Sequence, residues 1–300
     1  MKIFCAILIS ALLSGCFARA ATDMPIETVT YTPDGWPQAL QADIWHPQGD
    51  GPHPAMLMVH GGGWERRSRE DMDKLCRHYV ARGYVVMNVS YRLAPRHTYP
   101  AQVHDLQQAM HWLHRHADEL SVDPQRVAAF GYSAGAHLIS LLALAAGTGD
   151  ALDKPHGGLS TRPAAVIAGG SPMDLRKYPG GKLVPQFLGG RINDIPEVFA
   201  AASPVTRVHD QAPPFFLFHG GSDKLVTIDH AEEFIVAMQR ENVPATLYRQ
   251  RWRGHILAFL AIGDALEQAD QFLASTLTAD GQSGTGAGSA ASNAGGSGWD

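Results

Sequence analysis

The pentapeptide Gly131-Tyr132-Ser133-Ala134-Gly135 joins two apolar stretches of different character. The run before it, Arg126–Phe130, is typical of a buried strand, and the run after it, Ala134–Ala146, is typical of a helix. A serine on such a tight strand-to-helix turn is held in a strained backbone conformation and exposed toward a bound molecule. The flanking glycines permit the turn, because a Cβ at either position would clash with the neighbouring strand and helix. The pentapeptide therefore predicts a strand, a sharp turn and a helix, with Ser133 as a candidate nucleophile.

Short apolar runs alternate with helical patterns along the rest of the chain. The runs from Ala55 onward are almost entirely apolar, as expected for parallel strands that are buried on both faces. The first two runs alternate apolar and polar residues, which suits an antiparallel pair at the edge of a sheet. The predicted strands are Glu27–Tyr31, Ala42–Trp45, Ala55–His60, Tyr84–Ser90, Arg126–Gly131, Ala164–Ala168, Phe215–His219 and Thr246–Gln250. The predicted helices are Glu70–Arg82, Ala101–Glu119, Ala134–Ala146, Asp229–Glu241 and Ile256–Leu273.

This order of elements predicts an α/β fold with an eight-stranded, doubly wound and mostly parallel sheet. In such sheets, ligands bind at the carboxyl ends of the strands. Each chemistry-bearing motif of the sequence follows a predicted strand, so we expect the motifs to meet at one edge of the sheet.

A second glycine-rich motif, His60-Gly61-Gly62-Gly63-Trp64, ends the third predicted strand. Consecutive glycines expose backbone N–H groups, and a tetrahedral oxyanion needs two or three such donors. We assign the N–H groups of Gly62, Gly63 and Ala134 to an oxyanion hole, and we expect His60 to brace the loop. Trp64 is expected either to line a substrate pocket or to pack the loop. Tyr132, next to the candidate nucleophile, is a second candidate substrate contact.

A candidate acid and a candidate base follow in chain order. Asp223 comes directly after the predicted strand that ends at His219, and His255 lies between the last predicted strand and the last helix. A serine hydroxyl is inert until an imidazole accepts its proton, and the imidazole needs a carboxylate to fix its tautomer. We therefore expect Ser133 Oγ within about 3.5 Å of one ring nitrogen of His255, and Asp223 at the other. A helix-capping aspartate and a surface histidine are the alternative interpretations.

Four segments together resemble esterases near hormone-sensitive lipase, and they are most similar to bacterial carboxylesterases grouped with bifunctional feruloyl and acetyl-xylan esterases. These segments are His60–Trp64, Tyr91–Pro95, Tyr99–Asp105 and Gly131–His137. The resemblance covers roughly Pro54–Leu260 and implies an α/β-hydrolase fold, hydrolysis of carboxylic esters and no cofactor. Ser133–Leu138 also resembles the corresponding stretch of kynurenine formamidases.

The expected function is that of a serine carboxylic ester hydrolase that forms an acyl-enzyme on short-chain or polymer-borne esters of the acetyl or feruloyl type. The substrate is then a small molecule or an ester linked to a polysaccharide. An amide-type hydrolase, either formamidase-like or a peptidase, is the alternative, and a non-catalytic binding module is a third. The relatives of hormone-sensitive lipase usually carry a helical cap before the strand that leads to the HGGG motif. Here about thirty residues precede that strand after the leader, so we expect no N-terminal cap.

The two ends of the chain differ from the body at residues 24–277. Residues 1–20 are typical of a signal peptide, with Lys2, an apolar run and small residues, so we expect export to the periplasm or beyond. Ala18-Arg19-Ala20 predicts a soluble secreted form, whereas the lipobox-like residues 13–16 predict a lipid anchor at Cys16. Residues 278–300 are rich in Gly and Ser and predict a disordered tail.

Composition excludes some classes of function. A formal net charge of −5 gives no general attraction to nucleic acid. Cys76 is the one cysteine of the body and is expected to be a buried apolar residue. His111 and His114 have metal-compatible spacing on one predicted helix, but no carboxylate cluster accompanies them, and we expect no metal.

Three further features concern the predicted active-site edge. Arg92 and Asp105 are expected to pair and brace the oxyanion loop. The insertion Gly170–Pro204 is expected to form a small lid or rim. Two arginine-rich loops predict either ordinary solvated surface or a basic rim that prefers anionic substrates; their arginines are Arg66, Arg67, Arg69, Arg251 and Arg253.

Overall fold

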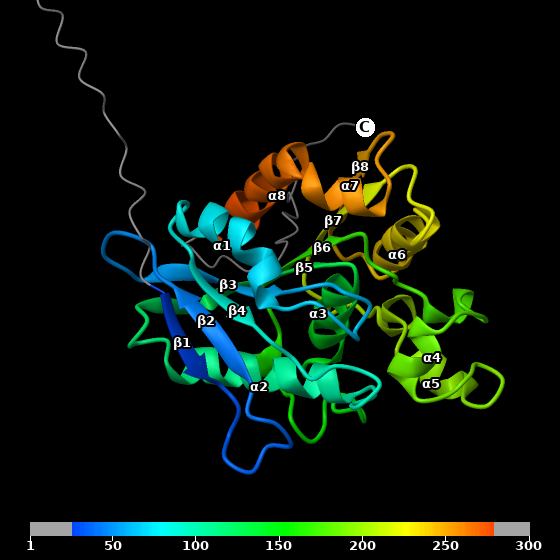
Figure 1. The fold of residues 1–300 in the computed structure, drawn as a ribbon. Coiled ribbons are helices and arrows are strands. Elements are labelled where there is room, and N and C mark those ends of the chain that lie inside the picture. Colours follow the sequence, from blue (N-terminus) through cyan, green and yellow to red (C-terminus); the bar gives the residue numbers. More distant parts are fainter. Residues whose placement is uncertain (1–25, 279–300) are drawn as a thin grey trace, which may run out of the picture.

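An eight-stranded sheet crosses the computed structural model, which describes residues 26–278 (Figure 1). The strands are β1 (Ile26–Thr30), β2 (Gln41–Trp45), β3 (His53–Val59), β4 (Val85–Val89), β5 (Val122–Tyr132), β6 (Ala165–Gly169), β7 (Phe215–Gly220) and β8 (Ala245–Gln250). Their order in the sheet is β1-β2-β4-β3-β5-β6-β7-β8. β2 is antiparallel to β1 and β4, and all neighbours from β4 to β8 are parallel. The predicted mostly parallel α/β sheet with an antiparallel edge is confirmed.

Helices cover both faces of the sheet (Figure 1). α1 (Asp73–Val80) and α8 (Gly263–Thr276) pack on one face, where their buried side chains share a core with the strands. α2 (Ala101–Arg115), α3 (Ala134–Ala145) and α6 (Asp229–Arg240) contribute to the core on the other face. This double cover explains why the central strands are apolar on both sides.

The alternation of side chains along β5 shows the two cores directly. Val127 and Ala129 point into the core that contains α3, whereas Ala128 and Phe130 point into the core that contains α1 and α8. Successive residues of a strand face opposite sides of the sheet, so a strand covered on both sides needs an unbroken apolar run. α3 is also buried along its whole length. The turn between β5 and α3 therefore joins two elements that are both buried in the core, and their packing holds it in place.

The predicted helix bounds need correction at three places. The last predicted helix, Ile256–Leu273, is in fact two helices, α7 (His255–Leu260) and α8, because the chain turns at Ala261, whose carbonyl accepts a hydrogen bond of 2.6 Å from the Arg253 guanidinium. The predicted helix Glu70–Arg82 begins instead as a 3-10 turn at Arg69–Met72. The helix predicted to end at Glu119 ends at Arg115.

Residues 26–52 form β1, β2 and their loops without a helix, in agreement with the expected lack of a helical cap there. The predicted insertion contains two short helices, α4 (Leu183–Leu188) and α5 (Pro196–Ala201). No helix among residues 26–278 is long and apolar enough to cross a membrane. The predicted signal peptide at 1–20, the possible anchor Cys16 and nearly all of the predicted tail at 278–300 lie outside the described residues.

Candidate active site

The turn between β5 and α3 has the geometry that the pentapeptide predicts. Ser133 lies in the left-handed region with φ 55° and ψ −120°, a conformation that non-glycine residues rarely adopt. A Cβ on Gly131 would lie 2.5 Å from the carbonyl carbon of Gly135, and a Cβ on Gly135 would lie 2.2 Å from the carbonyl oxygen of Val59. These contacts are too close for any side chain. The turn is further held by a 2.7 Å hydrogen bond from Ser133 N to the carbonyl of Gly169.

Ser133, His255 and Asp223 form one hydrogen-bonded chain. His255 Nε2 lies 2.9 Å from Ser133 Oγ, and His255 Nδ1 lies 2.6 Å from Asp223 Oδ2. Each residue follows a different parallel strand, β5, β7 and β8, and all three meet at the carboxyl edge of the sheet. The predicted distances are confirmed. Ser133 and His255 are partly accessible to solvent, whereas Asp223 is buried.

The carboxylate of Asp223 is held in its charged form. Burial alone would raise its pKa, but the hydrogen bond from His255 and those from the backbone N–H groups of Val226 and Leu225 outweigh burial and lower the pKa. Both N–H groups lie 2.9 Å from Oδ1, which leaves Oδ2 for the imidazole. A charged carboxylate at Nδ1 leaves Nε2 of a neutral imidazole free to accept a proton from the serine.

The two loops that carry Asp223 and His255 are joined through their backbones. Ser222 N donates to the carbonyl of Arg253 at 3.0 Å, and Gly221 N donates to the carbonyl of Gln250 at 2.9 Å. A Cβ on Gly220 would lie 2.4 Å from the same carbonyl oxygen of Arg253. The close approach fixes the distance between acid and base.

The predicted oxyanion loop, His60–Trp64, lies against the same turn. Register pairs Val59 at the end of β3 with Gly131, and a Cβ on Gly61 would lie 2.8 Å from the carbonyl oxygen of Tyr132. The N–H groups of Gly62 and Gly63 donate to no acceptor within residues 26–278. Ala134 is the first residue of α3, where backbone N–H groups have no partner within the helix. The predicted donors are thus available beside Ser133.

Comparison with known proteins places this architecture in a family. Residues 42–238 match the family model described as BD-FAE, which is more than half of the chain. The chain belongs to the BD-FAE family. It is 29% identical over 249 residues to the esterase LipQ of Mycobacterium tuberculosis, covering 80% of this chain and 57% of LipQ. It is 32% identical over 192 residues to the esterase LipC of the same organism, covering 61% and 48% respectively. The chain thus spans about half the length of these relatives.

Solved structures of an esterase are also similar to this chain, over nearly the whole length of that esterase. The apo form of Thermogutta terrifontis esterase 2 is 27% identical, with a TM-score of 0.71, and the match covers 86% of this chain and 97% of that one. Other structures of the same esterase hold propionate or butyrate. The predicted resemblance to α/β-hydrolase carboxylesterases is confirmed.

In this BD-FAE family member, Trp64 packs the oxyanion loop. It is 4% exposed, its ring stacks on Phe187 of α4 at 4.5 Å, and its indole N–H donates to His137 Nδ1 at 3.3 Å. Of the two expected roles, these contacts favour packing of the loop over lining a substrate pocket, because Phe187 of α4 covers the ring. His137 in turn donates from Nε2 to the carbonyl of Ala202 at 2.8 Å, so it joins the oxyanion loop to the insertion.

Sequence reasoning missed His137, although a signal for it was present. It is the one ionisable side chain in α3, which is otherwise built of apolar and small residues. Burial lowers the pKa of His137 to about 4, so the ring is neutral and can accept from Trp64 at one nitrogen while it donates from the other.

Tyr132 also requires a correction. It is 6% exposed, and its ring centroid lies 5.8 Å from that of Phe218 and 4.7 Å from that of Phe259. Its hydroxyl donates to the backbone carbonyl of His255. A side chain buried in this way braces the loop that runs from β8 to His255 at the start of α7 (the histidine loop). Its surface is not free to contact a substrate.

The expected pairing of Arg92 with Asp105 is confirmed. The guanidinium and the backbone N–H of Arg92 both donate to the buried carboxylate of Asp105, with distances of 2.8 Å and 2.9 Å. His60 is buried and stacks on Tyr91 with centroids 4.4 Å apart, and the Tyr91 hydroxyl donates to the carbonyl of His60 at 3.0 Å. Burial lowers the pKa of His60, which suits a bracing role.

Most arginines of the predicted basic rim are paired with carboxylates. The distance from a guanidinium nitrogen to a carboxylate oxygen is 3.6 Å for Arg66 and Glu65, 3.4 Å for Arg67 and Asp71, and 2.7 Å for Arg69 and Asp43. Arg253 lies 3.4 Å from Asp264. Arg251 stacks over Trp252 at 5.7 Å and pairs with no carboxylate within residues 26–278. These pairs favour ordinary solvated surface over a basic rim.

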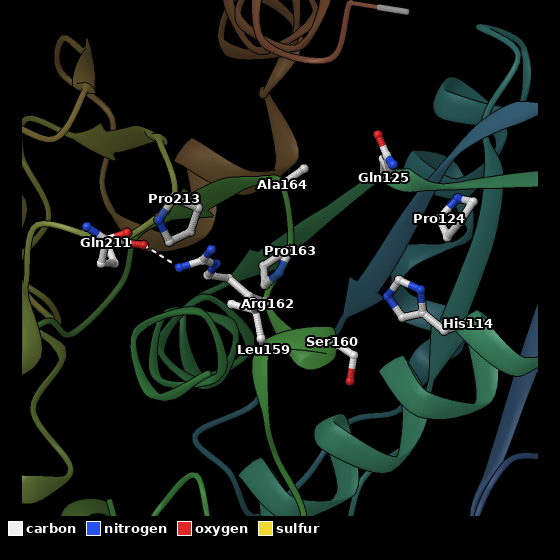
Figure 2. A pocket seen from close by; sticks show the side chains of 11 residues that line it. His114, Pro124, Gln125, Leu159, Ser160, Arg162, Pro163, Ala164, Gln211 and Pro213 are labelled. Atoms are coloured by element: carbon white, nitrogen blue, oxygen red, sulfur yellow. Dashed lines mark hydrogen bonds between the residues drawn. The ribbon is translucent and has the colours of Figure 1, made fainter. Parts of the chain in front are cut away.

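A hollow of about 400 Å³ lies outside this site, and Figure 2 shows the side chains that line it. Its lining residues precede the strands β6 and β7 or lie early in β5, so it opens at the amino edge of the parallel strands; they include Gln125, Leu159, Arg162, Pro163 and Gln211. His114 also lines it. Cys76 of α1 is buried in the core between α1, α8 and the sheet, as predicted. The described residues hold no group of three or more His, Cys, Asp or Glu side chains that could bind a metal ion.

Proposed function

We propose that this chain is a serine carboxylic ester hydrolase that acts through an acyl-enzyme. The observation that carries the proposal is the hydrogen-bonded chain from Ser133 Oγ through His255 to Asp223, with distances of 2.9 Å and 2.6 Å. Available N–H donors lie beside it at Gly62, Gly63 and Ala134. The family membership and the esterase relatives support the same reaction.

The geometry assigns a role to each group. Ser133 Oγ attacks the carbonyl carbon of the ester and gives its proton to His255 Nε2, while Asp223 holds the opposite N–H and stabilises the imidazolium. The carbonyl oxygen becomes an oxyanion beside the unpaired N–H groups of the oxyanion loop. His255 then gives the proton to the leaving alcohol, and a water molecule, activated by the same imidazole, hydrolyses the acyl-serine.

The substrates in this proposal are short-chain or polymer-borne esters of the acetyl or feruloyl type. The propionate and butyrate held by Thermogutta terrifontis esterase 2 are short acyl products and support a short acyl group. Apolar side chains around His255 support an apolar group elsewhere in the ester; Trp252 is 81% exposed, and Ile256 and Leu260 are each 65% exposed. Export from the cytoplasm, with or without a lipid anchor, is part of the proposal and rests on residues 1–20 alone.

The test is the substitution Ser133→Ala. Turnover of p-nitrophenyl acetate should fall by at least about 10⁴-fold, because loss of the nucleophile removes the covalent route. The melting temperature should change little, since alanine fits the same turn. Paraoxon should label the wild type at one site and leave the variant unlabelled. Turnover that survives the substitution would move the nucleophile elsewhere.

Matched substrates separate the ester and amide alternatives. p-Nitrophenyl acetate, methyl ferulate and acetylated xylan report ester hydrolysis, while N-formylkynurenine and a peptide p-nitroanilide report amide hydrolysis. We expect kcat/KM to be higher for the esters. A preference for N-formylkynurenine would favour the formamidase-like alternative suggested by Ser133–Leu138.

A further inference from the structure

We propose that Tyr132 is a positioning residue that fixes the imidazole of His255 relative to Ser133. The phenol hydroxyl donates to the backbone carbonyl of His255, and the two ring centroids lie 5.2 Å apart. The inference rests on the proposed function, since it assigns Tyr132 a part in the same reaction.

The position of Tyr132 in the chain gives the contact its effect. Tyr132 is the residue immediately before Ser133, so one dipeptide carries the nucleophile and also holds the base. A shift of the β5–α3 turn moves both groups together and preserves the 2.9 Å contact between Ser133 Oγ and His255 Nε2. Without this link, the histidine loop would be located by the β7–β8 side of the site alone.

The surroundings of Tyr132 restrict it to one arrangement. Its ring lies beside Phe218 and Phe259, and a Cβ on Gly170 would lie 3.0 Å from the Tyr132 hydroxyl and 3.2 Å from His255 Cε1. Glycine at 170 thus leaves the space in which the hydroxyl and the imidazole lie next to each other. The Tyr132 ring packs in the core, and its hydroxyl donates a hydrogen bond to the histidine loop. A mutation that removes the hydroxyl alone therefore separates the packing from the hydrogen bond.

The experiment is Tyr132→Phe in the full chain, because phenylalanine keeps the ring and removes the hydroxyl alone. We expect kcat for p-nitrophenyl acetate to fall about tenfold with KM unchanged, since the imidazole loses its alignment and the binding surface does not change. The downfield proton resonance of the His255 Nδ1–H bound to Asp223 should broaden or shift. Tyr79→Phe is the matched control, because the buried Tyr79 hydroxyl has no hydrogen-bond partner in the described part of the chain. Its kcat should equal that of the wild type.

The outcomes are distinguishable. An unchanged kcat in Tyr132→Phe, in an active wild type, overturns the positioning role and leaves the proposed function intact. A lower kcat with an unaltered Nδ1–H resonance also overturns it, because the imidazole would then keep its position without the Tyr132 hydroxyl. A wild type without turnover would overturn the proposed function, and the resonance would still decide whether Tyr132 holds the imidazole.

Discussion

The two halves of the candidate active site are built by different means. At the ends of β3 and β5, the backbone itself sets the shape: a Cβ on Gly135 would lie 2.2 Å from the Val59 carbonyl oxygen, and one on Gly62 would lie 2.0 Å from that of Arg66. At the ends of β7 and β8, one close backbone approach, that of Gly220 to the Arg253 carbonyl, is supplemented by side-chain hydrogen bonds. There Asp223 receives two backbone N–H groups and the imidazole, and Tyr132 reaches across to His255.

This difference shows which parts of a site can be predicted from sequence motifs. Where one backbone passes within van der Waals contact of another, glycine alone fits, and the requirement appears as the motifs at 61–63 and 131–135. Where a hydrogen bond holds a loop, several residue types could donate that bond, so the sequence contains no fixed motif for it. The glycines that meet backbone atoms, Gly61, Gly62, Gly131 and Gly135, should therefore tolerate no substitution. Substitutions of the side chains at the ends of β7 and β8 should lower activity in graded steps.

The largest effect is expected for Gly135→Ala. The added Cβ would meet the Val59 and His60 carbonyl oxygens at 2.2 Å and 2.5 Å, and neither backbone can move without displacing β3. We expect loss of soluble folded protein or of all turnover. Gly254→Ala, directly beside His255, is the matched control, because its Cβ would find only Ser222 O at 3.7 Å. Circular dichroism and p-nitrophenyl acetate turnover measure both. A well-folded, active Gly135→Ala enzyme would contradict the comparison.

The second prediction tests the side chains at the ends of β7 and β8 with Asp223→Asn. The amide oxygen can still accept from Leu225 and Val226, so the loop keeps its shape, but the imidazole loses the carboxylate that fixes its tautomer. We expect kcat to fall by about 10⁴-fold with little change in melting temperature. Asp270→Asn, which removes a carboxylate paired with His78 and Arg82 on the far face, should leave kcat unchanged. Unfolding of the Asp223 variant would show that its loop depends on the charge.

The same distinction explains how far the sequence predicts the molecule. The sheet, the glycine motifs and the Ser133, Asp223 and His255 distances follow from local patterns, because each motif ends an apolar run and parallel strands end at one edge. The Arg92–Asp105 pair also follows from placement. The burial of Trp64 and Tyr132 and the link through His137 do not follow, since they depend on α4 and α7 crossing above the motifs.

The break between α7 and α8 is another feature that does not follow from local sequence patterns. The apolar pattern runs through 256–273 without interruption, and the helix ends because the Arg253 guanidinium caps the carbonyl of Ala261 from outside the helix. Periodicity reports which face is buried and carries no information about such a contact.

The third prediction concerns His137, which links the oxyanion loop through Trp64 to Ala202 of the insertion. Its pKa in the folded protein is about 4, below the value of about 6.5 in the unfolded chain. The unfolded state therefore binds more protons between these values, and stability is complete above pH 6.5 and is lost as the pH falls toward 4. We expect the melting temperature to fall by on the order of 5 °C over this range.

Two variants check the origin of that loss. His137→Gln should give a lower melting temperature at pH 7 and a flatter pH dependence, because the titrating group is gone. His53→Gln, which removes an imidazole in an exposed contact with Gly49, should keep the wild-type slope. The buried His230 also has its pKa lowered to about 4 and contributes to the remaining slope. An unchanged slope in His137→Gln would show that this ring titrates freely in the folded state.

The smallest effect is expected at the arginines that border the site. Arg66, Arg67 and Arg253 each lie within 3.6 Å of a carboxylate, so their fields largely cancel at a distance, and Arg251 alone adds uncompensated charge. One exposed charge is strongly screened in salt. We therefore expect kcat/KM for a matched acidic and neutral ester pair to change by less than about twofold relative to one another between about 20 mM and 500 mM salt. Arg251→Gln/Arg253→Gln should give the same profiles. A steep salt dependence for the acidic ester, lost in that double variant, would show that the two arginines capture anionic substrates despite the Asp264 pair.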